Sequence, residues 1–508
     1  MADGFRIVVA VDAPQHAGIG ALLDYSSEQP LAPGTLVRVP LGKRSVPGIV
    51  WDHRGHAAPA EGPLRAIEEV MAPLPALADG WRRLVDFAAG YYQRSVGELA
   101  LAVLPPELRK LDATQIGRRL AKLARLPTRT EAEAPPLPDL TAEQATALAA
   151  LQATREPALL HGVTGSGKTE VYLRAAEAAL QAGAQVLVLV PEINLTPQLE
   201  ARFAARFPGR CLVSLHSGLN DGERLKHWLA AQSGSARIVL GTRLAVFAPL
   251  PDLGLIIVDE EHDASFKQSE GFRYSARDLA VVRARQRGVP VVLGSATPAL
   301  ETWHNAATGR YALTQLPKRI NLTPPRIHCV PTRDVRLQDG LAPSLIAAIG
   351  KRLAAKEQVL IFINRRGYAP VLLCHDCGWL SNCHRCSAKL VLHLRDRQLH
   401  CHHCGHQTLA PKACPDCGNA DLSPVGQGTQ RVEAALAAHF PQARVLRIDR
   451  DSTRNKGAWS GMRTRIEARE VDILVGTQIL AKGHDFPSLS LVGVINADSL
   501  RSEEHTSE

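Results

Sequence analysis

Short apolar runs alternate with amphipathic stretches over most of the chain, from about residue 140 to residue 498. Each run has the length of a β-strand, and the stretch after it has the spacing of a helix with one apolar face. This alternation is typical of parallel strands joined by crossover helices. Because it occurs on both sides of about residue 335, we predict an α/β fold with two lobes. The predicted strands are PALLHG, VLVLVP, RIVLGT, LGLIIVDE and PVVLGS in the first lobe, and QVLIFIN and DILVGT in the second.

The N-terminal part has a different pattern. Strand-like runs separated by turns precede a stretch with helical spacing, which predicts a small β-rich domain with three strands and one helix, at residues 5–11, 36–40, 46–51 and 80–104. A short basic helix (115–125) and a stretch rich in proline and glutamate follow. The predicted organisation is an N-terminal domain (1–106), a linker (107–139), a first lobe (140–334), a second lobe (335–498) with a cysteine-rich insertion (374–417), and a tail (499–508).

The amino-acid composition limits the class of protein but does not identify its function. Hydrophobic residues make up 45% of the chain and charged residues 21%, which is typical of globular domains. We see no signal peptide and no apolar run long enough to span a membrane, so we expect a cytoplasmic protein without a membrane partner. The net charge of +9 suits a polyanionic partner. If eight thiolates (−8) and two Zn²⁺ (+4) are included, the charge falls to +5, so the charge is weak evidence.

A phosphate-binding loop is predicted by the string GVTGSGKT, which follows a strand and precedes a helix. Its glycines would let backbone N–H groups surround phosphate oxygens at the helix N-terminus. Lys168 would reach the β- and γ-phosphates, and Thr169 would hold Mg²⁺. The alternative, a chance glycine-rich turn, does not explain the flanking strand and helix. The predicted nucleotide-binding residues are Gly162, Val163, Thr164, Gly165, Ser166, Gly167, Lys168 and Thr169.

The string LGLIIVDEEH is the expected second half of this site. The strand would deliver Asp259 to Mg²⁺, and Glu260 would act as a general base that orients the attacking water. A solvated acidic turn is the alternative. Gln144, which lies before the loop in LTAEQ, could contact adenine, although an isolated glutamine is more often a surface helix residue. Together these residues predict an ATPase that uses ATP with Mg²⁺.

Eight of the ten cysteines lie in four CxxC pairs, which is typical of structural zinc sites in a cytosolic protein. Three pairings of the knuckles are possible. KLVLHLRDRQLHC, between the second and third pairs, has the pattern of a hairpin, which would bring those two pairs together. The predicted ligands are therefore Cys383, Cys386, Cys401 and Cys404 for one zinc, and Cys374, Cys377, Cys414 and Cys417 for the other. We expect the remaining cysteines, Cys211 and Cys329, to be buried.

A resemblance to one family rests on long strings in their expected order: GVTGSGKTEVY, VPEINLTPQ, GTR, DEEHD, GSATPALET, NRRGYAP, CHDCGW, RIDRDST and LAKGHDFP. The chain resembles the bacterial primosomal replication-restart helicases, the PriA family, over about residues 5–105 and 140–498. The resemblance implies two RecA-like P-loop helicase lobes, a zinc-binding insertion in the second lobe and an N-terminal DNA-binding domain. It also implies 3′→5′ unwinding at stalled forks, with forked and single-stranded DNA, primosome proteins and single-stranded DNA-binding protein as partners.

The same resemblance assigns roles to two further segments. HDASFKQSEGFRYSARD is similar to the family's aromatic-rich loop, in which aromatic side chains would stack on bases and basic ones would contact phosphates. The alternative is that the rings pack the loop onto the first lobe. LDY, near the N-terminus, is similar to a pocket for a DNA 3′ end, in which a carboxylate accepts a hydrogen bond from the terminal hydroxyl. The implied DNA-binding residues are Asp24, Tyr25, Phe266, Lys267, Phe272, Arg273, Tyr274 and Arg277.

The chain departs from the family pattern in three places. The region 107–139 is short for the family's winged-helix domain, and Leu23 replaces the usual phenylalanine of the 3′-end pocket. A final motif similar to QVAGRAGR, with its arginine finger, does not occur. The tail RSEEHTSE resembles a translated sequencing adapter, so we expect the chain to be a fragment that hydrolyses ATP poorly. The rival interpretations are a primosome scaffold with a disabled ATPase and a dedicated RNA helicase.

Overall fold

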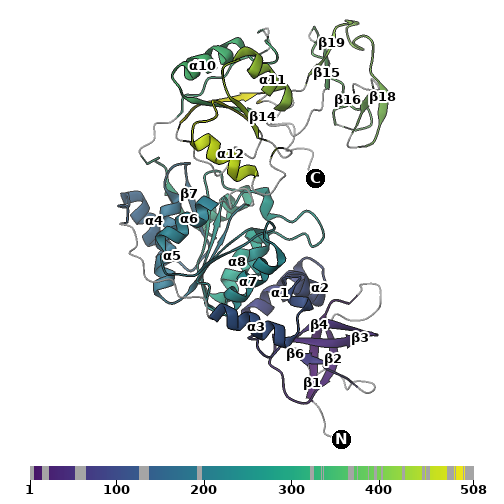
Figure 1. Cartoon of the computed structure of the whole chain (residues 1–508), viewed down its shortest axis with the longest axis vertical. Helices are drawn as coiled ribbons and strands as arrows, with labels where there is room; N and C mark the ends of the chain where they lie inside the picture. The colour runs from purple at the N-terminus through teal and green to yellow at the C-terminus, as the bar shows by residue number, and fades with distance from the viewer. Residues whose placement is uncertain are drawn as a thin grey trace. The chain divides into compact units, whose positions relative to one another are not determined.

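The computed structural model describes two compact units, Met1–Pro324 and Pro325–Glu508 (Figure 1). The residues it describes are 5–13, 22–51, 64–124, 137–191, 197–320, 325–332, 335, 337–363, 371–374, 376–386, 388–393, 398–401, 404–425, 429–448, 452, 458–476, 486, 488–495 and 497. Several predicted motifs lie outside them: NRRGYAP, most of LAKGHDFP, parts of VPEINLTPQ and RIDRDST, and the tail.

The N-terminal domain is built on a six-stranded sheet of order β5-β2-β1-β4-β3-β6. The strands are β1 (Phe5–Val11), β2 (Leu22–Ser27), β3 (Leu36–Leu41), β4 (Arg44–Val50), β5 (Arg65–Ala66) and β6 (Glu69–Val70). The sheet curls because residues 65–70 bind both edges: Ile67 N–H donates to the Ser26 carbonyl and Glu68 N–H to the Arg38 carbonyl, both at 2.9 Å. The three strands predicted here are confirmed, and β2, β5 and β6 are additional.

Two helices stand where one was predicted over 80–104. They are α1 (Asp79–Tyr91) and α2 (Val96–Ala102). The helical conformation is interrupted between them because Gln93 is left-handed (φ 56°). The Ser95 side chain then caps α2 by accepting a hydrogen bond from the Glu98 N–H at 3.2 Å. The short turn η1 (Leu108–Lys110) and the helix α3 (Ala113–Ala124) follow. Ile116 of α3 is fully buried, so the first half of the predicted linker is folded structure.

The first lobe contains the predicted parallel sheet, with strand order β13-β7-β12-β11-β8-β10-β9. Its strands are β7 (Ala158–Gly162), β8 (Gln185–Leu189), β9 (Leu212–Leu215), β10 (Ile238–Gly241), β11 (Leu253–Asp259), β12 (Val291–Ser295) and β13 (Ala312–Leu316). The five predicted strands are confirmed, whereas β9 and β13 were missed. Since β12 lies between β7 and β11, the segments after these three strands meet at one edge of the sheet.

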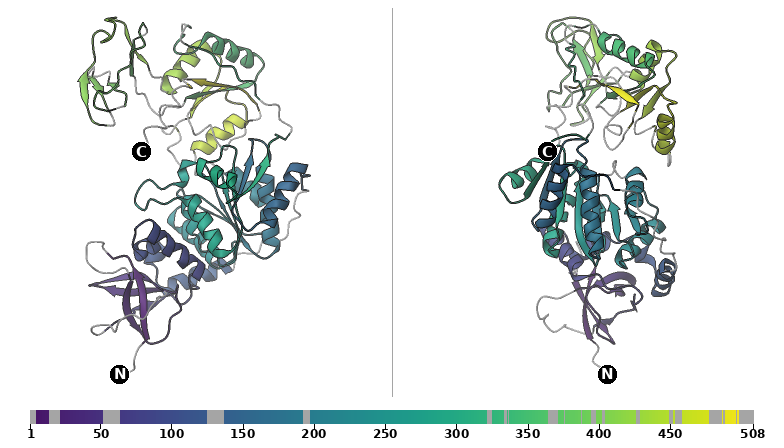
Figure 2. Two further views of the ribbon diagram at one scale, coloured as in Figure 1. Left: turned by 180° about the vertical axis from the view of Figure 1, so that it is seen from behind. Right: turned by 90° about the vertical axis from the view of Figure 1, so that its left-hand side faces the viewer.

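Helices cover both faces of this sheet, as Figures 1 and 2 show. Alternate side chains of the central strands point to opposite faces: Ile257 joins a cluster with α4, α5 and α6, and Val258 joins a cluster with α7 and α8. The helices and short turns are α4 (Ala142–Ala153), α5 (Lys168–Gln181), α6 (Pro197–Arg206), α7 (Asp221–Gln232), η2 (Arg243–Phe247), η3 (Ala264–Phe266), α8 (Ala276–Arg287) and α9 (Leu300–Ala307).

The N-terminal domain and the first lobe share one apolar core. A single cluster of buried side chains runs from Ile49 and Trp81 into Phe247 and Ile256 of the lobe. The Trp81 indole N–H donates to the Phe247 carbonyl at 2.8 Å. Buried Arg283 of α8 holds the same segment by donating to the carbonyls of Val246 and Ala248, each at 2.7 Å. The domain is therefore packed onto the lobe rather than tethered to it.

The second unit contains a four-stranded parallel sheet of order β20-β21-β14-β22. These strands are β20 (Val445–Ile448), β21 (Ile473–Gly476), β14 (Gln358–Ile363) and β22 (Leu489–Ile495), with helices α10 (Pro343–Ala354), α11 (Thr429–His439) and α12 (Ala458–Glu467). The cysteine-rich insertion forms β15 (Val371–Cys374) with β19 (Leu422–Val425), and β16 (Val391–His393), β17 (Gln398–His400) and β18 (Gln407–Leu409). None of the described helices has both the length and the apolar character needed to cross a membrane.

Candidate functional site

The phosphate-binding loop joins the end of β7 to the start of α5 at Lys168. Gly165 and Gly167 have φ angles of 80° and 79°, a left-handed conformation that costs glycine little. A Cβ at Gly162 would lie 2.6 Å from the Ser166 Oγ, and one at Gly167 only 2.3 Å from the Gln144 Nε2. The buried Lys168 ammonium donates to the Gly162 carbonyl at 2.8 Å, so the loop wraps around its own lysine.

These residues fit a nucleotide phosphate. The loop ends at the N-terminus of a 14-residue helix, where backbone N–H groups and the helix dipole favour an anion. The Ser166 Oγ is buried and makes no hydrogen bond to any described residue. Thr169 is half-buried in the first turn of α5, and Asp259 ends β11. Hydroxyl and carboxylate oxygens are ligands that Mg²⁺ prefers.

Gln144 braces the loop from α4. It forms a capping box with Thr141, in which the Thr141 N–H donates to the Gln144 Oε1 at 2.9 Å. Its Nε2 donates to the carbonyls of Ser166 and Gly167, both at 3.3 Å. The side chain is 2% exposed, so the alternative of a surface glutamine is wrong. A contact with adenine stays a prediction.

Tyr172 connects α5 to Asp259. Its hydroxyl donates to the Asp259 Oδ1 at 3.0 Å. Burial, and then the charge of Glu260, raise the pKa of the Asp259 carboxyl to about 6, and a bound divalent cation would favour its charged form. Gly294 of β12 leaves room for this tyrosine, because a Cβ there would lie 1.5 Å from the Tyr172 oxygen. Reasoning from the sequence missed Tyr172, since a tyrosine on a helix carries no motif.

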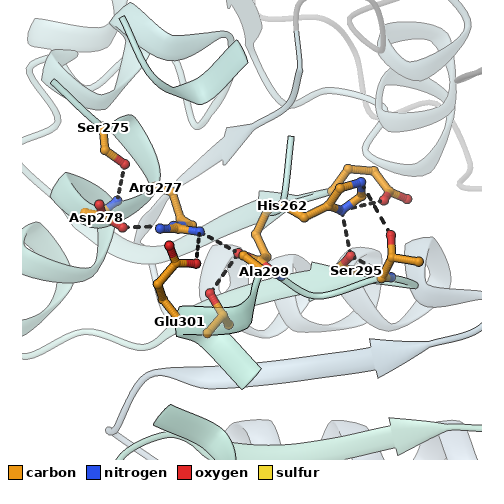
Figure 3. Close-up of polar contacts among 11 residues, drawn as sticks. His262, Ser275, Arg277, Asp278, Ser295, Ala299 and Glu301 are labelled. Carbon is orange, nitrogen blue, oxygen red and sulfur yellow. Dashed lines mark hydrogen bonds and ion pairs between the residues drawn. The ribbon is translucent and has the colours of Figure 1, made fainter. Parts of the chain in front are cut away.

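Glu260 is joined to the GSAT segment through His262. The Glu260 backbone is left-handed (φ 48°), and its carboxylate lies 3.5 Å from the His262 Nδ1. The same nitrogen lies 2.8 Å from the Ser295 Oγ, which also accepts the Thr297 N–H at 3.0 Å. Figure 3 shows His262 beside Ser295. Any displacement of the GSAT segment would therefore reach the carboxylate that is predicted to orient water.

The next residue, Glu261, is buried and connects the DEEH segment to the start of α9 and to α8, which the sequence did not reveal. Its carboxylate accepts hydrogen bonds from the Ala299 N–H and the Thr302 hydroxyl, both at 2.8 Å. Only 1% of the surface of Glu261 is exposed. The Arg277 guanidinium of α8 lies 3.4 Å from the Glu261 carboxylate. Arg277 also pairs with Asp278 at 2.8 Å, as Figure 3 shows. The guanidinium of Arg277 is thus engaged by carboxylates, and its contact with a DNA phosphate stays a prediction.

The aromatic-rich loop turns most of its rings inward. Phe266 and Tyr274 are only 3% and 4% exposed, so the prediction that they present stacking faces is wrong. Phe272 is half-buried and stacks on Tyr274 with ring centres 4.9 Å apart. The rings instead pack the loop onto the lobe, because apolar rings are stabilised by burial. Lys267 and Arg273 are exposed, as a phosphate contact would require.

Asp24 lies on the strand β2, although an aspartate by its residue type alone would be expected in a turn. Both of its oxygens accept from Arg6, at 2.9 and 2.6 Å. Tyr25 faces the opposite side of the strand, where it is 3% exposed and donates to the Pro40 carbonyl at 3.1 Å. A direct contact between Tyr25 and DNA is therefore wrong for this conformation. The interaction of Asp24 with a 3′ hydroxyl stays a prediction.

The structure gathers the eight clustered cysteines in the predicted nested arrangement. The closest sulfur pairs are Cys374–Cys417 and Cys377–Cys414 at 3.5 Å in one set, and Cys383–Cys404 at 3.6 Å and Cys386–Cys401 at 3.5 Å in the other. A zinc ion with four thiolates at about 2.3 Å sets sulfur atoms about 3.8 Å apart. Each set therefore fits a structural zinc ion, and two such ions stay the predicted number.

A repeated backbone turn positions these thiols. After three of the four CxxC pairs comes a left-handed glycine, whose N–H donates to the carbonyl of the first cysteine at 2.9 to 3.0 Å; these are Gly378, Gly405 and Gly418. The antiparallel pair β16–β17 confirms the predicted hairpin, whose turn lies outside the described residues. By contrast, Cys211 and Cys329 are exposed, so their predicted burial is wrong. Both stand in segments that connect elements of structure.

Comparison with known proteins gives the class first. The family model described as DEAD/DEAH box helicase matches residues 141–306, which contain the phosphate-binding loop and the DEEH segment. Two further models match: the 3′ DNA-binding domain over residues 8–105, and the PriA DNA helicase Cys-rich region domain over residues 383–408. The first unit thus contains a helicase lobe together with a DNA-binding domain.

Curated relatives define the family. The replication restart protein PriA of Haemophilus influenzae is 48% identical over 342 residues, covering 67% of this chain and 47% of the relative. That of Rickettsia felis is 35% identical over 487 residues, covering 93% and 72%. The chain belongs to the family of the replication restart protein PriA, and it spans about half the length of the H. influenzae relative. A solved structure of RecG bound to a three-way DNA junction is 15% identical, covering 84% of this chain and 51% of that chain, with a TM-score of 0.40.

Proposed function

We propose that the protein is an ATP-dependent 3′→5′ DNA helicase that recognises stalled or collapsed replication forks and initiates primosome assembly. The observation that carries this proposal is the convergence of Lys168, Asp259 and Glu260 at one edge of a helicase-lobe sheet. The match to a 3′ DNA-binding domain supports DNA as the substrate. Family membership supports primosome proteins and single-stranded DNA-binding protein as partners, and action at the nucleoid in the cytoplasm.

ATP with Mg²⁺ would supply the phosphoryl group and neutralise its charge. Backbone N–H groups of residues 162–169 would bind the phosphates, and Lys168 would leave the Gly162 carbonyl to bind phosphate oxygens. Thr169 and Asp259 would hold the metal. Glu260 would orient the attacking water, and its neighbour His262 would report the position of the GSAT segment.

Two substitutions test the motor. In the full-length protein, Lys168→Ala and Glu260→Gln should each reduce DNA-stimulated ATP hydrolysis to background, while fork affinity stays within a few-fold of wild type. Glu156→Gln is the matched control for Glu260→Gln, since Glu156 is exposed and lies on the connection before β7. Steady-state phosphate release with and without forked DNA is the measurement. Hydrolysis at the wild-type rate in either active-site variant would refute the assignment.

A second experiment addresses the 3′ end. If Asp24 accepts a hydrogen bond from a terminal hydroxyl, a 3′-phosphate on the arrested leading strand should weaken fork binding, because like charge would then face the carboxylate. The neighbouring Arg6 reduces this repulsion without removing the preference for a donor. Asp24→Asn should lose this discrimination against the 3′-phosphate, because the like charge is gone and Arg6 no longer has its carboxylate partner. Equal affinity of the wild-type protein for blocked and free ends would reject the pocket.

A further inference from the structure

The solvent-exposed face of α1 carries two large aromatic side chains, which is unusual for an exposed helix face. Arg83, Phe87 and Tyr91 are four residues apart, so they lie along one face, and all three are exposed, whereas Trp81 and Leu84 are buried. Phe87 is 37% exposed and Tyr91 is 67% exposed. Their rings are nearly parallel, with 5.6 Å between centres and 13° between planes. Two large apolar surfaces are thus presented together to solvent.

The contacts of these two rings continue into the aromatic-rich loop. Tyr91 makes an edge contact with Tyr92 at 4.9 Å, and Tyr92 makes one with Phe272 at 5.4 Å. The Tyr92 hydroxyl accepts the Ser275 N–H at 3.0 Å. Arg94, which follows the left-handed Gln93 beyond the end of α1, donates to the Gly271 carbonyl at 3.2 Å. A chain of rings therefore runs from the surface of α1 into the lobe core.

The exposed end of that chain is on α1 and not on the loop. Phe266 and Tyr274 are buried, whereas Phe87 and Tyr91 are exposed. Three arginines lie near the exposed rings. Arg83 of α1 pairs with Asp79 at 2.7 Å, Arg94 beyond the end of α1 pairs with Glu98 at 3.5 Å, and Arg273 is exposed beside the loop ring that contacts Tyr92. Flat rings with flanking cations are the arrangement by which proteins bind single-stranded nucleic acid.

We propose that Phe87 and Tyr91 form a base-stacking platform for single-stranded DNA on the outer face of α1. The proposal rests on the proposed function only in taking DNA as the ligand, which the match of residues 8–105 to a 3′ DNA-binding domain supports. Every base has a π-face, so the platform accepts bases without sequence preference. Duplex DNA is a poorer ligand, because its bases are already stacked on one another.

The test measures binding and needs no ATP. A fluorescent oligo-dT with a 3′-phosphate is titrated with the 508-residue chain, and its anisotropy gives Kd. The double substitution Phe87→Leu/Tyr91→Leu keeps apolar surface and removes the π-faces, and we expect binding about fivefold weaker or more. Phe5→Leu is the matched control, because Phe5 is another exposed ring in the same domain, and it should leave Kd within twofold. All three proteins should melt at the same temperature, since the substituted rings are exposed.

A second oligonucleotide separates stacking from other roles. In it, abasic sites replace the bases while the backbone charge is kept. Wild type should bind it about fivefold more weakly than oligo-dT, and the double variant should bind the two equally. Equal Kd for wild type and double variant would overturn the platform. So would an equal loss for both oligonucleotides, which would point to a protein-docking surface or a change of fold. Failure of ATP hydrolysis would leave these results unchanged, so the two proposals can fail separately.

Discussion

Replacing Gly294 by alanine should damage the nucleotide site from within its own sheet. The added Cβ would lie 1.5 Å from the Tyr172 oxygen and 2.6 Å from the adjoining ring carbon. Contacts under 3.0 Å are essentially never seen, so the oxygen must move by at least 1.5 Å (3.0 − 1.5). Tyr172 is 2% exposed and has little space to do so. Overpacking of this kind costs about 1–3 kcal/mol.

The same movement breaks the 3.0 Å hydrogen bond from Tyr172 to Asp259. A hydrogen bond to a charged group contributes about 1.5–3 kcal/mol, so the two effects together lower the free energy of unfolding by about 2.5–6 kcal/mol. We expect Gly294→Ala to lower the urea midpoint of unfolding, monitored by tryptophan fluorescence, and to weaken nucleotide binding.

A double-mutant cycle identifies the cause. Tyr172→Leu removes the oxygen and the ring carbons that the new Cβ would meet, so Gly294→Ala should cost at least about 1 kcal/mol less in that background than in wild type. An equal cost in both backgrounds would show that the glycine is needed for a reason other than Tyr172. A wild-type midpoint for Gly294→Ala alone would refute the packing described here.

Cys383→Ser should remove about one zinc ion per chain, since one lost thiolate weakens a four-cysteine site, while Cys211→Ser should remove none. Elemental analysis measures both, and one zinc or none in the folded wild-type protein would contradict two sites. Asp472→Asn should destabilise the protein at neutral pH, because hydrogen bonds from Arg444 hold the pKa of the Asp472 carboxyl below its usual range. The difference in melting temperature should shrink as pH falls below about 4 and through the lowered pKa; a constant difference would exclude this pair as its cause.

The sequence predicted the parallel strands, the phosphate-binding loop and the cysteine pairing, because each depends on local spacing. Buried strands such as LGLIIVD have to be apolar, and Cys-x-x-Cys places two thiols on one turn whatever surrounds it. The strands β9 (LVSL) and β13 (ALTQL) lie at the edges of the sheet and were missed because they are short and polar residues interrupt their apolar runs.

Which way an aromatic side chain faces could not be predicted. Phe266, Tyr274 and Tyr25 occur in strings that resemble DNA-binding segments, yet tertiary packing turns all three inward. Phe87 and Tyr91 attract no attention in the sequence because they lie in an ordinary amphipathic helix. Glu261 is likewise inconspicuous in the sequence because it directly follows the two acidic residues to which the motif assigns roles, although it is the most buried carboxylate of the three. Residue type sets what a side chain can do, and the fold sets what it can reach.

The apolar core that joins the N-terminal domain to the first lobe has a consequence for dissecting the molecule. Cutting the chain near residue 106 would expose Trp81 on one piece and Phe247 on the other, and it would leave the Phe247 carbonyl without its donor. The two parts should therefore unfold together, as one cooperative step in native-state hydrogen exchange. A soluble version of either piece would require its cut surface to be redesigned. Exchange of this DNA-binding domain between relatives would likewise require the lobe surface to be exchanged with it.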